Sequence, residues 1–360
     1  MVKASWSSGK APIWARCSVL VMRIGVGDND EVYEWLEDWA EVPSPDEARI
    51  GWAHHGLAVT SSGDIVSFHP ERPDVVIFGA DGRFLRSCPT RLKEGHGITL
   101  VDENGQEFIW VADPGKKMRR SADGAYGPEE ATAQGQVVKF SLDGIEVLSL
   151  PRPAHPVYEN GFYAPTSVAV DEVRHGGSGD VWVADGYGQH LVHRYRADGT
   201  YVQTLSGEEG AGSFNCPHGI FIDRRHTRPE LWVADRGNSR AQVYGLDGAF
   251  LRVVGQGFLN SPSAFASYGE SIVVAELHAR LAVLGADDDL IGYLGENGEV
   301  CALAGWPNGV DAGQHPVRMP ALQPGRFNSP HGLAADADGN LYVAEWLIGG
   351  RTIKLARVPR

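Results

Sequence analysis

The chain has 360 residues, of which 42% are hydrophobic, with 45 glycines, 21 prolines and a formal net charge of −14. Its length and apolar content suffice for a large core, and the many Gly and Pro residues favour short strands joined by turns. The negative charge argues against nucleic acid or an acidic membrane surface as a partner, and no apolar run is long enough to span a bilayer.

The first residues do not resemble the rest of the chain. Residues 1–22 contain a short apolar patch, VLVM, but no convincing signal-peptide core or cleavage site. We expect this stretch to be disordered and residues 23–360 to form a single domain. The cysteines show no CxxC pair and no framework spacing, which favours a cytoplasmic protein. They are Cys17, Cys88, Cys216 and Cys301.

A repeat of roughly 40 to 50 residues follows, which is typical of a propeller or solenoid. Each copy reads as four short strands, with WVAD or a variant on the second strand and often Asp-Gly before the fourth. Polar insertions near residues 116 to 135 and 305 to 328 interrupt the pattern. The six copies cover residues 54–88, 96–150, 165–205, 216–255, 262–295 and 330–358.

The sixth copy ends after its third strand, so its fourth strand must come from elsewhere or leave an open edge. The N-terminal segment VYEWLEDWA, residues 32–40, follows an acidic turn much as the fourth strands do. We therefore predict an all-β, six-bladed β-propeller of four-stranded antiparallel blades, with the last blade closed by an N-terminal strand. The repeat signature resembles the NHL family of propellers.

Four copies begin with His-Gly, at His55, His96, His218 and His331. The first strand of a blade is nearest the central channel, so these side chains are expected at one mouth of it. His96, His218 and His331 belong to alternate blades, about 120° apart around a six-fold ring. Three converging imidazoles can hold a divalent metal and leave a position open. The alternative is that each turn merely starts a strand, with its histidine capping a backbone group. His55 is an additional ligand or a group that supports one.

Two further candidates follow second strands and should lie at the same mouth. Tyr187 could serve as a general acid or base if a metal or cation lowers its pKa. Arg236 offers a planar fork for a substrate carboxylate or carbonyl. The alternatives are a tyrosine that packs over a turn and an arginine paired with a neighbouring aspartate.

The order of these motifs resembles the peptidyl-α-hydroxyglycine α-amidating lyases. The resemblance rests on HGIT at 96–99, VWVADGYG at 181–188, PHGI with LWVADRGNSR at 217–240, and PHGL with LYVAE at 330–345. It covers most of the chain from about residue 95 onward. It implies a six-bladed propeller with zinc held by His96, His218 and His331, a catalytic Tyr187, and Arg236 as one of two active-site arginines.

The chain also departs from that family. The other arginine follows a Phe-His pair in the first blade, where only the displaced Arg72 is available. The family's structural calcium uses an Asp after the last zinc ligand, but Gly332 stands there, which counts against calcium. The cysteine after the catalytic tyrosine is replaced by Gly188, so that disulfide is missing, as in an intracellular protein. His55 has no counterpart in the family pattern.

These features predict a metal-dependent lyase or hydrolase, similar to peptidylamidoglycolate lyase, that acts on a small, polar, carboxylated molecule. An N-linked hemiaminal would be cleaved without a redox cofactor. Two alternatives stay open: a non-catalytic NHL-type binding scaffold, and a calcium-dependent lactonase on the same propeller. The lactonase would recruit Glu276 and Glu345, which follow second strands.

Overall fold

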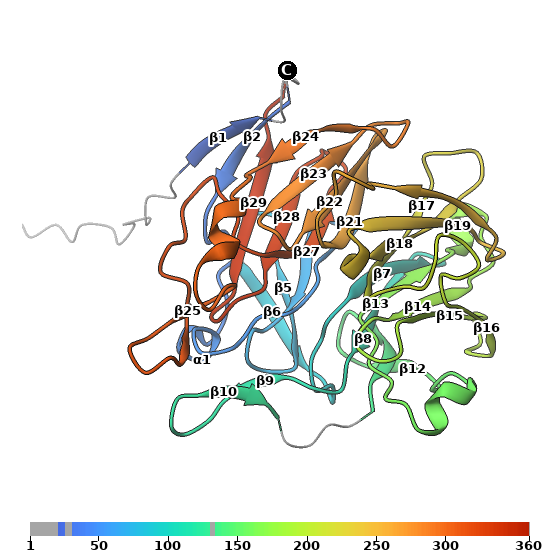
Figure 1. Ribbon diagram of the computed structural model, residues 1–360, viewed down its shortest axis with the longest axis horizontal. Coiled ribbons are helices and arrows are strands. Elements are labelled where there is room, and N and C mark those ends of the chain that lie inside the picture. The colour runs from blue at the N-terminus through green and yellow to red at the C-terminus, as the bar shows by residue number, and fades with distance from the viewer. Residues whose placement is uncertain (1–20, 26–30, 130–133, 360) are drawn as a thin grey trace, which may run out of the picture.

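The computed structural model describes residues 21–25, 31–129 and 134–359, and it confirms the predicted six-bladed β-propeller (Figure 1). Five blades are four-stranded antiparallel sheets, and the sixth has five strands. The expectation of disorder for residues 1–20 lies outside the described residues, whereas Val21–Gly25 form strand β1. No helix in the described ranges is long and apolar enough to cross a bilayer.

The strands follow the predicted repeats, since each apolar run rich in branched and aromatic residues forms one strand. The first three blades are β3–β6 (Ala58–Val59, Ile65–Phe68, Asp74–Phe78, Phe84–Pro89), β7, β8, β11 and β12 (Ile98–Glu103, Gln106–Asp113, Gln136–Ser141, Glu146–Leu150), and β13–β16 (Ser167–Val170, Val181–Asp185, Leu191–Tyr195, Tyr201–Leu205). The fourth and fifth blades are β17–β20 (Pro217–Asp223, Glu230–Asp235, Arg240–Gly245, Phe250–Val254) and β21–β24 (Pro262–Tyr268, Ser271–Glu276, Arg280–Leu284, Leu290–Leu294).

The sixth blade joins the two ends of the described chain, as predicted. Strands β27–β29 (Pro330–Ala335, Leu341–Glu345, Arg351–Arg357) are completed by β2 (Val32–Leu36), which pairs antiparallel with β29. Strand β1 adds a fifth strand outside β2. The closure is packed as well as hydrogen-bonded, because the Trp35 ring is fully buried and lies 4.7 Å from the ring of Phe327.

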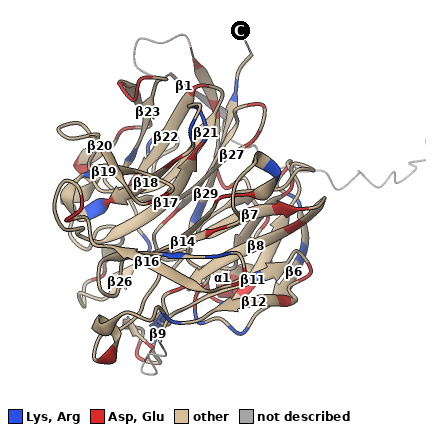
Figure 2. Ribbon diagram, turned by 90° about the vertical axis from the view of Figure 1, so that its right-hand side faces the viewer, with Lys and Arg blue, Asp and Glu red and all other residues tan. Residues whose placement is uncertain are grey.

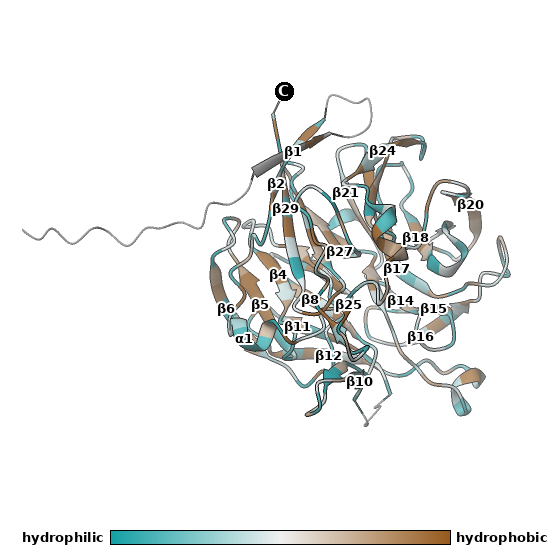
Figure 3. Cartoon of the chain, turned by 60° about the vertical axis from the view of Figure 1, so that its left-hand side comes forward, coloured by the Kyte–Doolittle hydropathy of each residue, from teal (hydrophilic) through white to brown (hydrophobic). Residues whose placement is uncertain are grey.

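The apolar core lies between neighbouring blades rather than in one centre. The WVAD tryptophans Trp110, Trp182 and Trp232 are buried at successive blade interfaces. Figure 3 shows the apolar residues concentrated in the strands and the polar ones in the connections. Lys and Arg are interspersed with Asp and Glu over the ribbon in Figure 2. Stability is therefore distributed around the ring, and the channel at its centre is free to carry polar groups.

The acidic residue that ends the second strand in the second to sixth blades has a structural role. Asp113 accepts hydrogen bonds from the backbone nitrogens of Lys93 and Glu94, at 2.8 and 3.2 Å, and Asp235 accepts one from Asn215 at 2.8 Å. In each case the anchored backbone is the loop that leads into the blade's first strand. The repeated WVAD motif thus fixes the loops that carry the histidines.

The insertions add short elements to the ring. Hairpin β9–β10 (Met118–Arg120, Tyr126–Pro128) leaves the second blade, and β25–β26 (Gly309–Val310, Pro316–Val317) precede the sixth. Helix α1 (Pro45–Ala48) lies before the first blade. Figure 1 shows α1, β9–β10 and β25 together in the lower part of the view. Short 3₁₀ turns cover Pro156–Glu159, Val173–His175, Arg236–Asn238 and Gly298–Ala302.

Candidate metal centre

Four histidines converge at one mouth of the channel. One ligand nitrogen of each lies within 4.8 Å of those of the others, and three of the four side chains are buried, with His54 partly exposed. They are His54, His96, His218 and His331. The structure thus brings together the three histidines predicted from alternate blades.

The glycine that follows each of His96, His218 and His331 explains how neighbouring first strands come so close. A Cβ on Gly97 would lie 2.5 Å from the carbonyl oxygen of Thr166, and one on Gly219 would lie 2.4 Å from that of Ser263. The same two carbonyls accept the Nδ1 protons of His96, at 2.6 Å, and of His218, at 2.8 Å. The His-Gly pair therefore supplies both a ligand and the close approach that orients it.

These hydrogen bonds fix the tautomers of His96 and His218. Burial is the main cause that lowers the pKa of His96, His218 and His331 well below its usual value, so all three are neutral at pH 7. With Nδ1 of His96 and His218 donating to a carbonyl, each Nε2 carries a lone pair directed into the centre. The Nε2 atoms of His218 and His331 lie only 3.2 Å apart.

The donor set fits a divalent transition metal. Several neutral imidazole nitrogens directed at one point are a favourable site for a cation, and imidazole suits zinc, copper, iron and nickel. Backbone carbonyls that hold the opposite ring nitrogen are the usual partners of metal-binding histidines. The residues present could therefore hold a metal ion, as the sequence predicted, and they do not by themselves select which one.

The histidine that joins the predicted trio is His54, and not His55. Adjacent residues in an extended backbone point to opposite sides, so only one of the pair can face the channel mouth. His54 Nε2 lies 2.9 Å from the hydroxyl of Tyr187. His55 faces Ser67, whose Oγ lies 3.0 Å from its Nδ1, and burial lowers the pKa of His55 to about 4.

Glu94 and Lys117 support His54, and sequence reasoning missed both. A Glu94 oxygen lies 3.4 Å from His54 Nδ1, and the other lies 3.3 Å from the Lys117 ammonium. Burial alone would raise the pKa of Glu94, but Lys117 and His54 lower it to about 2. A carboxylate behind a histidine orients the ring and raises its basicity. The signal in the sequence is faint: Glu94 lies two residues before His96, in the loop that Asp113 anchors.

Tyr187 lies in the middle of the histidines. Its hydroxyl oxygen is 2.9 Å from His54 Nε2, 3.0 Å from His218 Nε2 and 3.4 Å from His96 Nε2. One hydroxyl proton cannot serve three lone pairs, which again favours a cation at this point. Burial raises the pKa of Tyr187 to about 12, although the Arg236 guanidinium lowers it in part.

Arg236 is at the same mouth. Its guanidinium carbon lies 5.4 Å from the Tyr187 ring centre, and one nitrogen lies 3.4 Å from the tyrosine oxygen. Lys116 places its ammonium 5.3 Å from the same ring centre, a contact that the sequence did not reveal. Neither cation forms an ion pair with a carboxylate of the described residues. Both are therefore available to an anionic ligand.

The structure does not bring Arg72 to this centre. Its guanidinium lies 3.4 Å from carboxylates of Glu47 and Asp74 and donates to Ser44 Oγ, beside helix α1. The glutamates weighed for a lactonase are also bound elsewhere. Glu276 forms an ion pair with Arg280, and Glu345 pairs with Arg351.

A second group of potential ligands is satisfied without a metal. Asp223, His226 and Glu230 lie near one another. However, Arg225 binds Asp223 with hydrogen bonds of 2.9 to 3.1 Å, and Arg252 binds both oxygens of Glu230 at 2.7 and 2.9 Å. Bidentate guanidinium pairs occupy the carboxylate lone pairs that a cation would need.

The repeats, the ring of blades and the histidine centre define an NHL-type six-bladed propeller that resembles the peptidylglycine amidating enzymes. NHL repeat-containing protein 3 of Homo sapiens is 29% identical over 235 residues, which cover 62% of this chain and 61% of that protein. Peptidylglycine alpha-amidating monooxygenase of Rattus norvegicus is 26% identical over 347 residues, 85% of this chain and 32% of that protein. No protein-family model matches the chain.

The chain thus spans about three fifths of one relative's length and about a third of the other's. Solved structures with the same fold include a gluconolactonase from Xanthomonas campestris, with a TM-score of 0.58, 14% identity and coverage of 93% of this chain and 94% of that one. Virginiamycin B lyase from Staphylococcus aureus has a TM-score of 0.52 and 12% identity, covering 91% of this chain and all of that one. At these identities the likeness concerns the fold alone.

Proposed function

We propose that this propeller is a zinc-dependent carbon–nitrogen lyase of the peptidylamidoglycolate lyase type. Its substrate is a small, carboxylated N-linked hemiaminal, an N-acyl-α-hydroxyglycine. The observation that carries the proposal is the convergence of four imidazoles, three of which contact the hydroxyl of Tyr187, beside two cations without carboxylate partners. The similarity to the amidating monooxygenases supports the choice of reaction.

His96, His218 and His331 would hold the zinc ion, with His54 as a fourth ligand or as the partner of Tyr187. Bound zinc would act as a Lewis acid on the substrate hydroxyl. Glu94 accepts the Nδ1 proton of His54, which leaves a lone pair on the Nε2 that faces the centre. Zinc and the cytoplasmic location both stay predictions.

The cations at the mouth bind the other end of the substrate. Arg236 presents a planar fork suited to a carboxylate. Lys116 adds a point charge near the same Tyr187 ring. Burial of Arg236 strengthens its attraction for an anion that replaces water there. The carboxylate would thus be fixed beside Tyr187, with the hydroxyl-bearing carbon toward the histidines.

Tyr187 then moves the proton. Cleavage converts the hemiaminal into an amide and glyoxylate: the hydroxyl loses a proton, its oxygen forms the aldehyde C=O, and the C–N bond breaks. The electron pair of that bond goes to the amide nitrogen, which takes up one proton. One hydroxyl that gives its proton to the leaving nitrogen and takes up the proton of the substrate hydroxyl balances the reaction, so no redox cofactor is consumed.

The experiment measures metal content and glyoxylate release on the same preparations. We expect about one zinc per chain and glyoxylate from an N-acyl-α-hydroxyglycine. His218→Ala should lose the zinc, and Tyr187→Phe should keep it but lose roughly 100-fold or more in kcat. His175→Ala is the matched control, since that imidazole is 46% exposed and remote from the four histidines.

Two results separate the alternatives. Protein that lacks zinc and ignores added zinc would favour the non-catalytic binding scaffold. Zinc-loaded protein that releases no glyoxylate, yet opens a lactone in a His218-dependent manner, would replace the lyase with a metal-dependent hydrolase on the same centre.

A further inference from the structure

A wall of aromatic rings begins at the metal centre and runs outward along the mouth. The Trp346 ring lies 5.6 Å from that of His54, at an interplanar angle of 33°. Beyond it, Trp52 lies 6.1 Å from Trp346 at 32°, and Trp306 lies 6.4 Å from Trp346 at 89°. Tyr126 meets Trp52 edge-on at 5.7 Å. We name Trp52, Tyr126, Trp306 and Trp346 the aromatic wall.

The members of the wall are partly exposed, unlike the core tryptophans. All four are intermediate in burial, whereas Trp110, Trp182 and Trp232 are buried between the blades. Three of the four come from outside the repeated strands, since Trp52 precedes the first blade and Tyr126 and Trp306 lie in the two insertions. The insertions therefore place apolar rings at the mouth, where blade packing does not require them.

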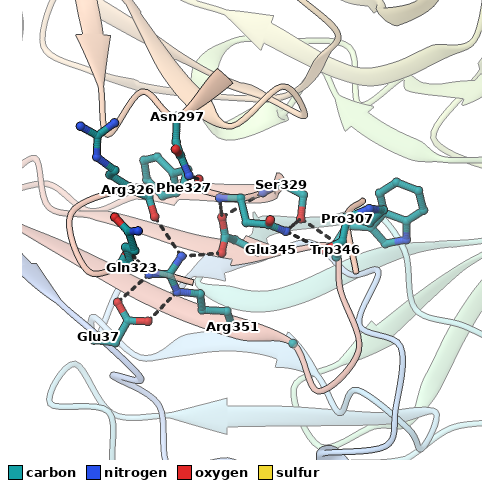
Figure 4. A network of polar contacts seen from close by, with 12 residues as sticks. Glu37, Asn297, Pro307, Gln323, Arg326, Phe327, Ser329, Glu345, Trp346 and Arg351 are labelled. Atoms are coloured by element: carbon teal, nitrogen blue, oxygen red, sulfur yellow. Dashed lines mark hydrogen bonds and ion pairs between the residues drawn. The ribbon is translucent and has the colours of Figure 1, made fainter. Parts of the chain in front are cut away.

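A buried polar network holds the wall in place (Figure 4). Glu345, the residue before Trp346, accepts the backbone nitrogens of Asn328 and Ser329 at 2.5 and 3.0 Å and pairs with Arg351 at 3.0 Å. Ser329 Oγ donates to the carbonyl of Trp346 at 2.7 Å.

Two of the other rings are also fixed by hydrogen bonds. The Trp306 indole nitrogen donates to the carbonyl of Asn328 at 3.0 Å, and the Tyr126 hydroxyl donates to that of Ile50 at 2.8 Å. A ligand that stacks on these rings would find them already ordered, which lowers the entropic cost of binding.

The tryptophans Trp346 and Trp52 lie across the ring from Arg236. Tyr187 and Arg236 belong to the third and fourth blades, whereas Trp346 belongs to the sixth and Trp52 precedes the first. In a closed ring of six, the junction of blades three and four is opposite that of blades six and one. A molecule held by its carboxylate at Arg236 and by its hydroxyl at the histidines would extend its far end over Trp346.

We propose that the aromatic wall is the subsite for the acyl group of the substrate, and that it selects a flat aromatic acyl group. This inference rests on the proposed function for the orientation of the substrate. Aromatic rings at the observed spacings offer offset and edge-on contacts to a further ring, and such contacts add to the gain from burying apolar area.

The test compares the binding of two uncleavable ligands to the zinc-loaded protein by titration calorimetry. N-benzoylglycine and N-acetylglycine share the carboxylate and the amide, and they differ only in phenyl against methyl. We expect N-benzoylglycine to bind at least about tenfold more tightly. The double variant Trp52→Leu/Trp346→Leu should reduce this ratio to about one, while Trp346→Phe should retain most of it.

Trp39→Leu is the matched control, because that ring packs against Phe78 and Tyr342 rather than the wall, and its ratio should equal that of the wild type. Thermal melting shows whether each variant is folded. Equal affinities in the wild type, undetectable binding of both ligands, or a preference that survives in the folded double variant would overturn the subsite. Tight, wall-dependent binding without cleavage of N-benzoyl-α-hydroxyglycine would instead refute the lyase and leave the subsite standing.

Discussion

The hydroxyl oxygen of Tyr187 lies 2.9 Å from Nε2 of His54, although 133 residues separate the two in the sequence. This contact joins the loop before the first blade's first strand to the turn after the third blade's second strand, at the channel mouth. It also corrects a prediction, since the His-Gly pattern points to His55, whereas the structure places the adjacent His54 at the centre.

His54→Ala should therefore weaken metal binding, whereas His55→Ala should not. Loss of His54 removes a donor nitrogen and leaves one Glu94 oxygen without its imidazole partner, so zinc affinity should fall by about 10- to 100-fold. His55→Ala should leave zinc affinity within about twofold, because its ring faces Ser67. Competition with a chelator measures both. A larger loss of zinc affinity in the His55 variant than in the His54 variant would contradict the assignment of His54 to the centre.

Gly219→Ala tests whether close strand approach orients the ligand. Its Cβ would lie 2.4 Å from the Ser263 oxygen that also accepts the proton of His218, so the strands must separate. We expect a loss of about 1–3 kcal/mol in the free energy of unfolding and at least about tenfold weaker zinc binding. Gly298→Ala, which has nothing within 4 Å of its added Cβ, is the control. Unchanged zinc affinity in the folded Gly219 variant would remove this role for the glycine.

Trp35→Ala tests the closure of the ring. The ring of Trp35 is fully buried, its nitrogen donates to Glu37 at 2.6 Å, and it packs on Phe327. Its truncation should lower the free energy of unfolding in urea by roughly 3–5 kcal/mol. Leu251→Ala, at a side chain with 47% exposure, should cost less than about 0.5 kcal/mol. Similar losses in the two variants would mean that β2 is not part of the cooperative unit.

His193 gives a pH dependence that is independent of the metal centre. Burial lowers its pKa to about 3, and its ring lies 2.7 Å from the Tyr158 hydroxyl and 2.8 Å from Thr204 Oγ1. Between its unfolded pKa, about 6.5, and its folded one, the unfolded state binds more protons, so stability falls as pH decreases through this window. The contribution is fully present above about pH 6.5, and its slope reaches about 1.4 kcal/mol per pH unit.

His193→Gln should therefore show a shallower decline in the free energy of unfolding between about pH 6 and pH 4 than the wild type. The variant removes only this one titrating group, and the remaining histidines serve as an internal reference. Denaturant titrations at several pH values give the comparison. Parallel curves for the two proteins would show that His193 does not titrate differently on unfolding.

The fold followed from the sequence because its signals are local and repeated. WVAD and Asp-Gly recur in register with the strands, and the missing fourth strand of the last copy points to residues 32–40 as its source. The trio of histidines could be grouped because alternate blades fix their angular spacing, which needs only the repeat count.

The rest of the centre depends on contacts that no short motif records. Which of two adjacent histidines faces the channel depends on the phase of an irregular loop, and Lys116 and Glu94 reach the site from insertions and loops without a repeat. Trp346 did have a signal, because it occupies the position after the second strand that Arg236 occupies in the fourth blade. Arg72 is held beside α1 by Glu47 and Asp74, which lie outside the repeat pattern.

The ion pair between Glu37 and Arg351, two hydrogen bonds at 2.5 and 2.9 Å across 314 residues, has a consequence for how the molecule is made. Arg351 also pairs with Glu345, the residue before Trp346. Glu345 in turn accepts a hydrogen bond from Asn328, in the loop that leads to His331. A growing polypeptide that has completed five blades lacks the Glu37–Arg351 ion pair, and it also lacks His331 and Trp346. A metal ion that requires His331 would thus be bound only after the last blade is synthesised, and a chain released early would be an open arc without that histidine.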